Sequence, residues 1–164
     1  MGDAISPNNY LMDFNNKLIA EQYAKNHSIF PHEKLDIFLS YVKGPILDIG
    51  CGVGEDVAYF RSKGNLAIGI DPSQSMVDLA NSVYVKKGST KTLNEYKGFS
   101  AYWLDGVIQF LDPASLLDVL NATDIKTIGF VIPIDYVMNI GDIVHSEEVI
   151  INGRSWLFII VQRV

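Results

Sequence analysis

The residues with the most evident chemistry are three alternating glycines, Gly50, Gly52 and Gly54, with Cys51 between the first two. They follow the apolar run 45–49 and precede an amphipathic stretch. A glycine has no Cβ atom to keep a ligand away from the main chain, and the start of a helix offers backbone N–H groups that have no partner within the helix. The pattern therefore predicts a ligand-binding loop between a first strand and a first helix.

The acidic residues around this loop discriminate between two classes of ligand. The dinucleotide fingerprint G-x-G-x-x-G places its third glycine at position 55, where this chain has Glu55, followed by Asp56. Carboxylates at these positions repel a pyrophosphate, and Asp48 adds a further acid at the end of the strand. We therefore disfavour a nicotinamide-dependent enzyme and expect a ligand with a cationic amino group and a sulfonium but no phosphate.

A single acid at the end of the next apolar run has a predicted role in binding a ribose. Asp71 stands 21 residues after Gly50, where a carboxylate can accept hydrogen bonds from two sugar hydroxyls. It is also suited to cap the helix that follows Pro72, and the two roles are compatible. We therefore predict that the ligand contains an adenosine.

The elements that position these residues alternate between strands and helices. Residues 45–49 and 66–70 are short apolar runs typical of buried strands, and the helix 55–62 lies between them. Such a βαβ unit makes the two strands parallel neighbours with a right-handed connection. The further predicted elements are helices at 11–23, from Pro31, at 73–81 and from Asp112, and strands at 83–86, 99–104 and 127–134.

The end of the chain has a different pattern. Residues 149–151 and 155–161 flank Asn152-Gly153, which predicts a hairpin with a type I′ turn. Residues 135–142 are too few for a helical crossover, which needs about a dozen residues or more. The last two strands therefore either continue as a meander beside the fifth strand or are displaced, with a changed strand order.

These elements predict an α/β fold: a Rossmann-like open sheet, mostly parallel, with helices on both faces and a C-terminal antiparallel hairpin. We expect one domain over 1–164, made of an N-terminal helical lid (1–44), a cofactor-binding α/β core (45–134) and C-terminal antiparallel strands (135–164).

Composition excludes several classes of function. Cys51 is the single cysteine and the three histidines are scattered, so we expect no disulfide and no structural metal. The net charge of −6 disfavours nucleic acid as a partner, and no apolar run is long enough for a membrane helix. The first ten residues do not resemble a secretory signal, and we therefore expect a cytoplasmic protein.

Four segments carry a resemblance to a known family. They are Ile19-Ala20-Glu21-Gln22-Tyr23-Ala24, the loop segment 46–56, the segment 67–76 and, more weakly, 107–112. With these motifs the chain resembles the class I S-adenosylmethionine-dependent methyltransferases, within the group that has an I-A-x-x-Y-A helix before the core. The resemblance implies S-adenosyl-L-methionine as cofactor and a small-molecule methyl acceptor.

The resemblance also implies roles for individual residues. Gly50 and Gly52 would line the methionine moiety, with Asp48 at its amino group and Asp71 at the ribose. The residues beside the transferred methyl would come from the end of the fourth strand, at 104–106. The predicted cofactor-binding residues are Tyr23, Asp48, Gly50, Cys51, Gly52, Gly54, Asp71, Pro72, Met76, Ser89 and Leu104, with Met76 near the adenine and with Tyr23 and His27 in the lid helix.

The sequence departs from the family at two places. Gly88-Ser89 stands where the family has Gly-Asp after its third strand, and Phe99-Ser100 stands in place of Phe-Asp. The short C-terminal part leaves the acceptor site either open or completed by a second copy or another chain. An alternative to the enzyme is therefore a catalytically eroded cofactor-binding domain that acts through a protein partner.

Methyl transfer is a direct displacement, so the protein mainly has to hold the acceptor in line with the methyl group. If a base is needed, Asp105 is the leading candidate because it ends the fourth strand, and Tyr23 and His27 are the others. Cys51 is not expected to act as a nucleophile, because no histidine is paired with it in the sequence.

Overall fold

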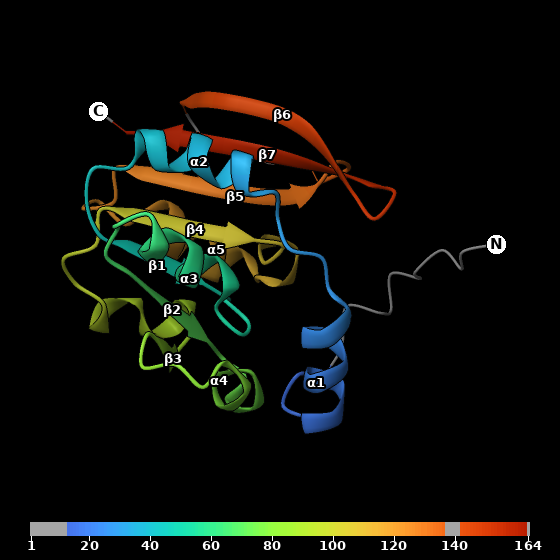
Figure 1. Ribbon diagram of the computed structural model, residues 1–164. Coiled ribbons are helices and arrows are strands. Elements are labelled where there is room, and N and C mark those ends of the chain that lie inside the picture. Colours follow the sequence, from blue (N-terminus) through green and yellow to red (C-terminus); the bar gives the residue numbers. More distant parts are fainter. Residues whose placement is uncertain (1–12, 137–141, 164) are drawn as a thin grey trace.

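The computed structural model describes residues 13–136 and 142–163, and their strands form a single sheet in the order β3-β2-β1-β4-β5-β7-β6 (Figure 1). Strands β1 to β5 are parallel, and β7 is antiparallel to both of its neighbours. The strands are β1 (Ile46–Ile49), β2 (Ala67–Asp71), β3 (Val85–Lys87), β4 (Ala101–Asp105), β5 (Thr127–Pro133), β6 (Ile143–Ile151) and β7 (Arg154–Gln162).

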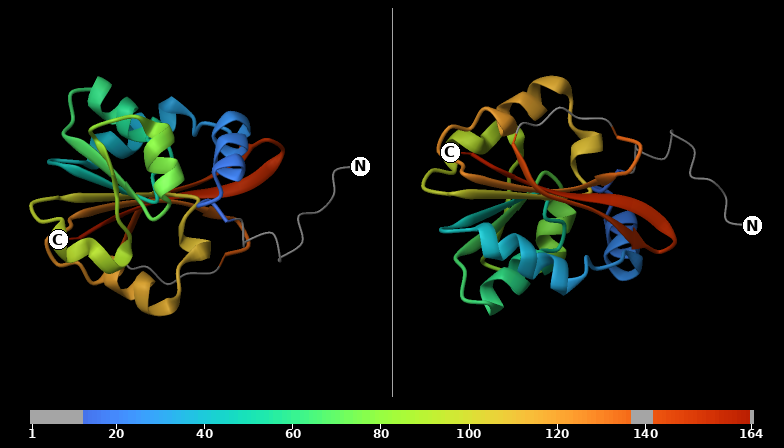
Figure 2. Two further views of the ribbon diagram at one scale, coloured as in Figure 1. Left: turned by 90° about the horizontal axis from the view of Figure 1, so that it is seen from below. Right: turned by 90° about the horizontal axis from the view of Figure 1, so that it is seen from above.

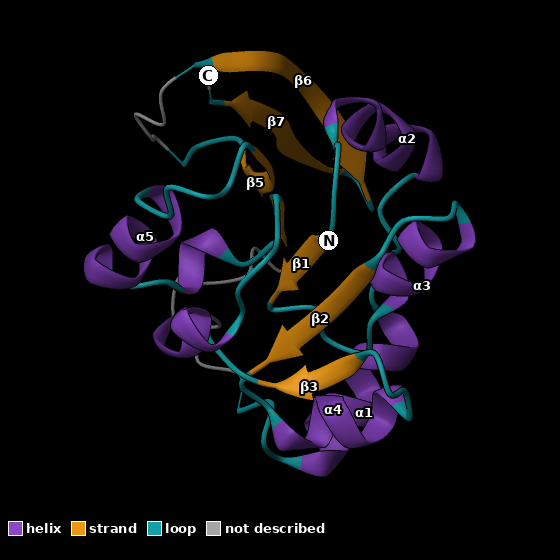
Figure 3. Cartoon of the chain, turned by 90° about the vertical axis from the view of Figure 1, so that its left-hand side faces the viewer, coloured by secondary structure: helices purple, strands orange, loops and turns teal. Residues whose placement is uncertain are grey.

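Helices cover both faces of the sheet, as Figures 2 and 3 show. Helices α2, α3 and α4 lie on one face, and α5 lies on the other. The helices are α1 (Lys17–Asn26), α2 (His32–Tyr41), α3 (Glu55–Ser62), α4 (Gln74–Ala80) and α5 (Pro113–Leu120), with short 3-10 helices η2 (Thr90–Glu95) and η3 (Ile108–Phe110). The predicted fold class is therefore confirmed.

The βαβ unit around the glycine loop agrees closely with its prediction. Helix α3 covers the predicted residues 55–62, and β1 and β2 pair in parallel from Ile46 beside Ala67 to Ile49 beside Ile70. Asp112 caps α5 by accepting a hydrogen bond from the Ser115 N–H at 2.8 Å. The first helix is shifted from its prediction: α1 begins at Lys17, and residues 11 and 12 of the predicted helix lie outside the described residues.

The C-terminal strands follow the displaced arrangement, not the meander. Strand β7 lies between β5 and β6, with Phe130 opposite Ile159 and with Ser146 opposite the same residue on the other side. Both Asn152 and Gly153 have positive φ angles, of 50° and 72°, as a type I′ turn requires. Because β5 and β6 are both antiparallel to β7, they run in the same direction, and nine residues (134–142) connect them.

Two layers of apolar side chains hold the helices to the sheet. On the side of α2 and α3 the indole of Trp103 is fully buried, with the rings of Phe38 and Phe60 centred 4.8 and 6.0 Å from it. On the side of α5, Val119 packs against strand residues that include Leu104 and Phe130. These layers fix β4 between two packed surfaces and so determine where its last residue emerges.

The strand order reverses between β1 and β4. From β1 the chain adds β2 and β3 on one side, and it then crosses to the other side of β1 to form β4 and β5. In open α/β sheets a ligand binds outside the carboxyl ends of the strands at such a switch point. Asp48 lies near the end of β1 and Asp105 ends β4, so this is the edge at which the predicted site residues meet. In the described part of the chain, no helix combines the length and the apolar character that crossing a lipid bilayer requires.

Candidate active site

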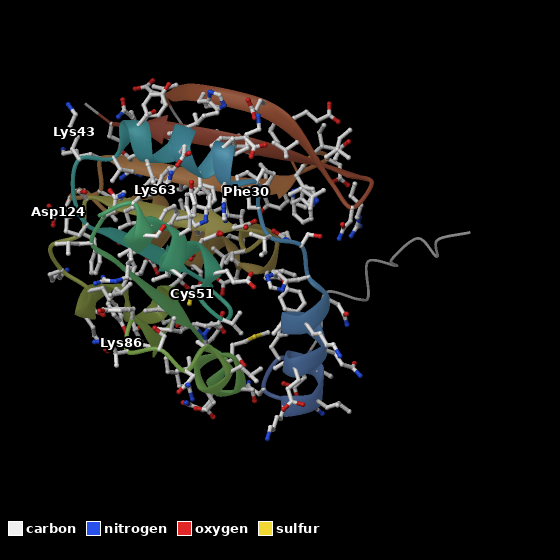
Figure 4. The ribbon with its side chains drawn as sticks, viewed as in Figure 1. Phe30, Lys43, Cys51, Lys63, Lys86 and Asp124 are labelled. Atoms are coloured by element: carbon white, nitrogen blue, oxygen red, sulfur yellow. The ribbon has the colours of Figure 1, made fainter. Side chains whose placement is uncertain are left out.

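A cavity of about 530 Å³ opens at the carboxyl ends of β1, β2 and β4 and is bordered on the other side by α1 and the segment that follows it. Cys51 and Phe30 contribute to its lining, whereas Lys43 and Asp124 lie at the opposite edge of the sheet (Figure 4). The volume is within the range of roughly 300–1,000 Å³ that is usual for small-molecule sites.

Most of the residues predicted from the sequence are brought together here. The predicted residues that line the cavity are Tyr23, Asp48, Gly50, Cys51, Gly52, Asp71, Pro72, Met76, Ser89 and Asp105. Two do not line it. Leu104 is fully buried in the apolar layer on the side of α5, and Gly54 begins α3 in the left-handed conformation, with its Cα turned toward Val85.

The glycine loop needs its glycines for different reasons. At Gly50 φ is 74° and a Cβ atom would lie 2.5 Å from Val107 Cγ2, so a side chain would meet the loop after β4. At Gly52 φ is 55° and a Cβ atom would meet nothing within 4 Å. The main chain at Gly52 is therefore open toward the cavity, where a ligand can approach it.

Asp71 joins the end of β2 to the glycine loop. Its Oδ2 accepts a hydrogen bond from the Gly52 N–H at 2.9 Å, and its Oδ1 accepts one from the Ser73 N–H at 2.9 Å. Ser73, not Asp71, caps α4, because its hydroxyl accepts from the Met76 N–H. Burial raises the pKa of Asp71, and these two N–H donors oppose that rise. Each carboxylate oxygen keeps a lone pair for a further donor.

A hydrogen-bonded pair of carboxyl groups lies at the end of β4. Trp103 Nε1 donates to Asp56 Oδ2 at 2.8 Å, and the Asp56 and Asp105 side chains are hydrogen-bonded to each other. Such a bond requires a proton on one carboxyl group. Burial and the charge of Asp56 raise the pKa of Asp105 well above its usual range. Burial also raises the pKa of Asp56, against the opposing effect of the Trp103 bond.

Asp48 is a third buried acid beside this pair. It is 2% exposed and lines the cavity, and no hydrogen bond or ion pair to its side chain is found among the described residues. Burial and the neighbouring charges of Asp56 and Asp105 raise its pKa well above the usual range. A cationic group bound beside Asp48 would lower the pKa of Asp48 and favour the ionised form of its carboxyl group.

Helix α1, the predicted lid, lines one side of the cavity. Tyr23 and His27 stack with ring centroids 5.0 Å apart, and His27 Nε2 lies 2.6 Å from Glu55 Oε2. The Ser75 hydroxyl donates to the Asn15 carbonyl at 2.8 Å, which joins the start of α1 to α4. Burial and the charge of Asp105 raise the pKa of Tyr23, so its phenol stays protonated.

The Cys51 thiol has no chemistry of its own in this site. Burial, reinforced by the charges of Asp48 and Asp71, raises its pKa far above the usual range and leaves no reactive thiolate. Its sulfur instead faces Gly69, where a Cβ atom would lie 2.5 Å from it. Cys51 thus fills the space between the loop and β2.

Ser89 lies at the cavity but uses its side chain locally. Its hydroxyl accepts from the Lys91 N–H at 3.2 Å, and its own N–H donates to Thr92 Oγ1 at 2.9 Å, which forms a capping box at the start of η2. Phe30 and Gln109 are among the lining residues to which sequence reasoning gave no role, and Asp56 was considered only as an acid next to the loop. The partnership of Asp56 with Trp103 spans 47 residues, and no local spacing could have revealed it.

Comparison with known proteins agrees with this geometry. Residues 46–121 match the family model described as a methyltransferase domain. No curated protein is significantly similar to the chain in sequence.

Solved structures give the wider comparison. Magnesium protoporphyrin IX methyltransferase from Synechocystis PCC 6803, determined with bound SAM, has a TM-score of 0.72 at 12% identity, with 100% of each chain covered. A TehB-like SAM-dependent methyltransferase from Corynebacterium glutamicum has a TM-score of 0.66 at 16% identity, with 90% of this chain and 100% of that chain covered. A SAM-dependent methyltransferase from Archaeoglobus fulgidus has a TM-score of 0.54 at 25% identity, with 62% of this chain and 51% of that chain covered.

The segment 46–121 thus matches a methyltransferase domain, and the strand order agrees with the Rossmann-like fold of the S-adenosylmethionine-dependent methyltransferases to which the chain is similar.

Proposed function

We propose that this protein transfers a methyl group from S-adenosylmethionine to a small-molecule acceptor. The observation that carries the proposal is the opening of the Gly52 main chain toward a cavity lined by two acids. Asp48 is a buried carboxyl with no partner among the described residues, and Asp71 offers two acceptor oxygens. These features suit an ammonium group and a ribose at the two ends of one ligand. The Synechocystis neighbour is named for a small-molecule acceptor, which supports the same class here.

The chain's own residues divide the binding between them in this proposal. Asp48 takes the ammonium of the methionine moiety, Gly50, Cys51 and Gly52 lie along its main chain, and Gly54 starts the helix behind them. Asp71 takes the ribose. Pro72, Met76 and Ser89 lie around the adenine, and Leu104 supports from behind the strand end that faces the methyl group. When bound, S-adenosylmethionine supplies an electrophilic methyl group.

The Asp56–Asp105 pair is the proposed proton acceptor. With one proton on the pair, Asp105 donates to Asp56 and keeps an oxygen free toward the cavity, which can accept a hydrogen bond from the acceptor's hydroxyl, amine or thiol. The raised pKa values of both acids favour the uptake of a second proton. Tyr23 and His27 exclude water from one side of the cavity.

The remaining expectations stay proposals. We propose one domain over 1–164, with residues 1–44 as a lid, in a cytoplasmic protein whose acceptor site is either complete in one chain or completed by a second copy or a partner. The alternative of a non-catalytic domain that acts through a partner has no support from the three solved structures described above, which are named as methyltransferases.

Calorimetric titration tests the cofactor. We expect S-adenosylmethionine and its demethylated product to bind and NAD not to bind. Transfer of a labelled methyl group to a pool of small nucleophilic compounds then tests catalysis. Binding of NAD in place of S-adenosylmethionine would overturn the proposal, and binding without transfer to any acceptor would favour the non-catalytic alternative.

A further inference from the structure

A second cavity of about 220 Å³ adjoins the first at the end of β4. The two share a wall that includes Tyr23, His27, Asp105 and Gly106. The opposite wall comes from the β6–β7 hairpin and consists of Ile151, Asn152, Arg154 and Trp156. The hairpin therefore reaches the edge of the sheet at which the proposed methyl donor binds.

The walls of this second cavity are partly aromatic. A Cβ atom on Gly106 would lie 3.9 Å from Trp156 Cζ3, so the indole of Trp156 covers the turn that follows Asp105. Phe30 is 1% exposed and is held by Trp103 and Phe158, with ring centroids 5.6 and 5.4 Å away. Flat apolar walls of this kind favour an unsaturated ring over a flexible polar chain.

Arg154 is the cation of this site. Of the three arginines, the side chain of Arg61 donates to the Ala67 carbonyl and that of Arg163 to the Ala122 carbonyl. No hydrogen bond or ion pair of the Arg154 guanidinium is found within residues 13–136 and 142–163. No lysine and no other arginine lines either cavity in this part of the chain. The guanidinium offers parallel N–H donors that match a carboxylate or a phosphate.

We infer that the acceptor is a small aromatic acid, with its anionic group on Arg154 and its nucleophilic atom beside Asp105. The inference rests on the proposed methyltransferase function and adds the class of acceptor. A cavity of about 220 Å³ is below the usual range for drug-sized ligands, which favours a single substituted ring. An acid at the far end of the ring also keeps the negative charge away from Asp48, Asp56 and Asp105.

The transfer step balances on this arrangement. The acceptor's oxygen, nitrogen or sulfur forms a bond to the methyl carbon while the bond from that carbon to sulfur breaks. The electron pair of the broken bond stays on sulfur, and the sulfonium becomes a thioether. The proton of the acceptor passes to the Asp56–Asp105 pair.

The test uses hydroxy-, amino- and mercaptobenzoates, their neutral methyl esters, and the corresponding aryl phosphates. We expect transfer to the acids and not to the esters, and the phosphates show whether the anionic group is a carboxylate or a phosphate. Arg154→Gln should raise KM for the acid at least about 10-fold, with kcat within about 2-fold, as for the loss of a hydrogen bond between charged groups.

A matched control removes a positive charge elsewhere. Lys97 is exposed and lines neither cavity, so Lys97→Gln should leave KM unchanged. The affinity of Arg154→Gln for S-adenosylmethionine should equal that of the unaltered chain. Equal rates with acids and esters, an unchanged KM in Arg154→Gln, or no transfer to any acid by a chain that binds S-adenosylmethionine would overturn the inference and leave the proposed function standing. Failure of S-adenosylmethionine to bind would overturn both.

Discussion

Asp71 accepts the N–H of Gly52 at 2.9 Å, so the acid proposed to bind the ribose also holds the glycine loop in place. The two functions are coupled through one side chain. A ligand on Asp71 meets a loop that is already oriented, and a change at Asp71 affects the loop even when no ligand is present.

Asp71→Ala should therefore reduce both affinity and stability. Loss of a charged hydrogen-bond acceptor predicts about 1.5–3 kcal/mol weaker binding of S-adenosylmethionine, and unpaired N–H groups at Gly52 and Ser73 predict a loss of about 1–3 kcal/mol in the free energy of unfolding. Calorimetry and denaturant titration measure the two effects. A folded variant with unchanged affinity would contradict the placement of the ribose.

Gly52→Ala and Gly64→Ala form a matched pair. Both glycines have a positive φ, of 55° and 88°, and at both a Cβ atom would meet nothing within 4 Å. Each alanine should cost roughly 1–2 kcal/mol of stability, since the left-handed conformation is strained with a Cβ atom. Binding of S-adenosylmethionine should be lost in Gly52→Ala alone, because Gly64 does not line the cavity. Equal affinities in the two variants would place the ligand elsewhere.

Asp105→Asn should stabilise the fold at neutral pH and lower kcat. The pKa of Asp105 is raised in the folded chain by burial and by the charge of Asp56, whereas the unfolded chain releases the proton above the ordinary Asp pKa of about 3.9. This contribution is fully present below that pKa and is lost as pH rises through the raised pKa of the folded state. An amide at this position also donates to Asp56 and carries no charge at any pH.

Thermal unfolding between pH 4 and 8 checks the sign. The melting temperature of the unaltered chain should fall as pH rises, and Asp105→Asn should reduce that slope and melt a few degrees higher at pH 8. Asp112→Asn is the control, because the pKa of Asp112 is lowered by its capping bond to Ser115 and no gain is expected there. A variant at Asp105 that melts lower at pH 8 than the unaltered chain would contradict the buried proton.

Trp103→Phe should disturb the proton acceptor through Asp56. The change removes the 2.8 Å donor to a buried carboxyl, so the free energy of unfolding should fall by about 1–3 kcal/mol and the pKa of Asp56 should rise further. The acidic limb of the pH–rate profile should move to higher pH, which a packing defect alone would not cause. Phe38→Leu alters the same aromatic layer without touching Asp56 and should leave the profile unchanged.

The local parts of the fold were predictable because local chemistry determines them. Local signals specify the boundaries of the elements around the loop, and these boundaries agree with the structure. The signals are the end of the apolar strand pattern at residue 50, the acids after the loop, and Asp112-Pro113 at the start of α5. Strand β6 was missed over residues 143–148 because residues 145–148 are four consecutive polar or charged side chains at the edge of the sheet. Residues 158–161 of β7 form a continuous apolar run, and all four are buried, as is typical of an interior strand. This run could have been used to place β7 inside the sheet.

The residues proposed to bind the methyl donor were predictable from the sequence, whereas those proposed to bind the acceptor were not. Asp48, the glycine loop and Asp71 follow one another along the chain, so their spacing carries a signal. Trp103 bonds Asp56 across 47 positions, and Arg154 lines a cavity with Asp105 across 49 positions, and the sequence has no periodic marker for either tertiary arrangement.

The hairpin that turns at Asn152-Gly153 lies far along the chain from the residues proposed to bind the methyl donor, so the proposed acceptor site and the proposed donor site come from separate segments. Substitutions between 151 and 156 can alter which compound is methylated while the first two strands keep their hold on the cofactor. Related proteins can thus differ in their methyl acceptor through changes in a single exposed turn, while the residues proposed to bind S-adenosylmethionine stay the same.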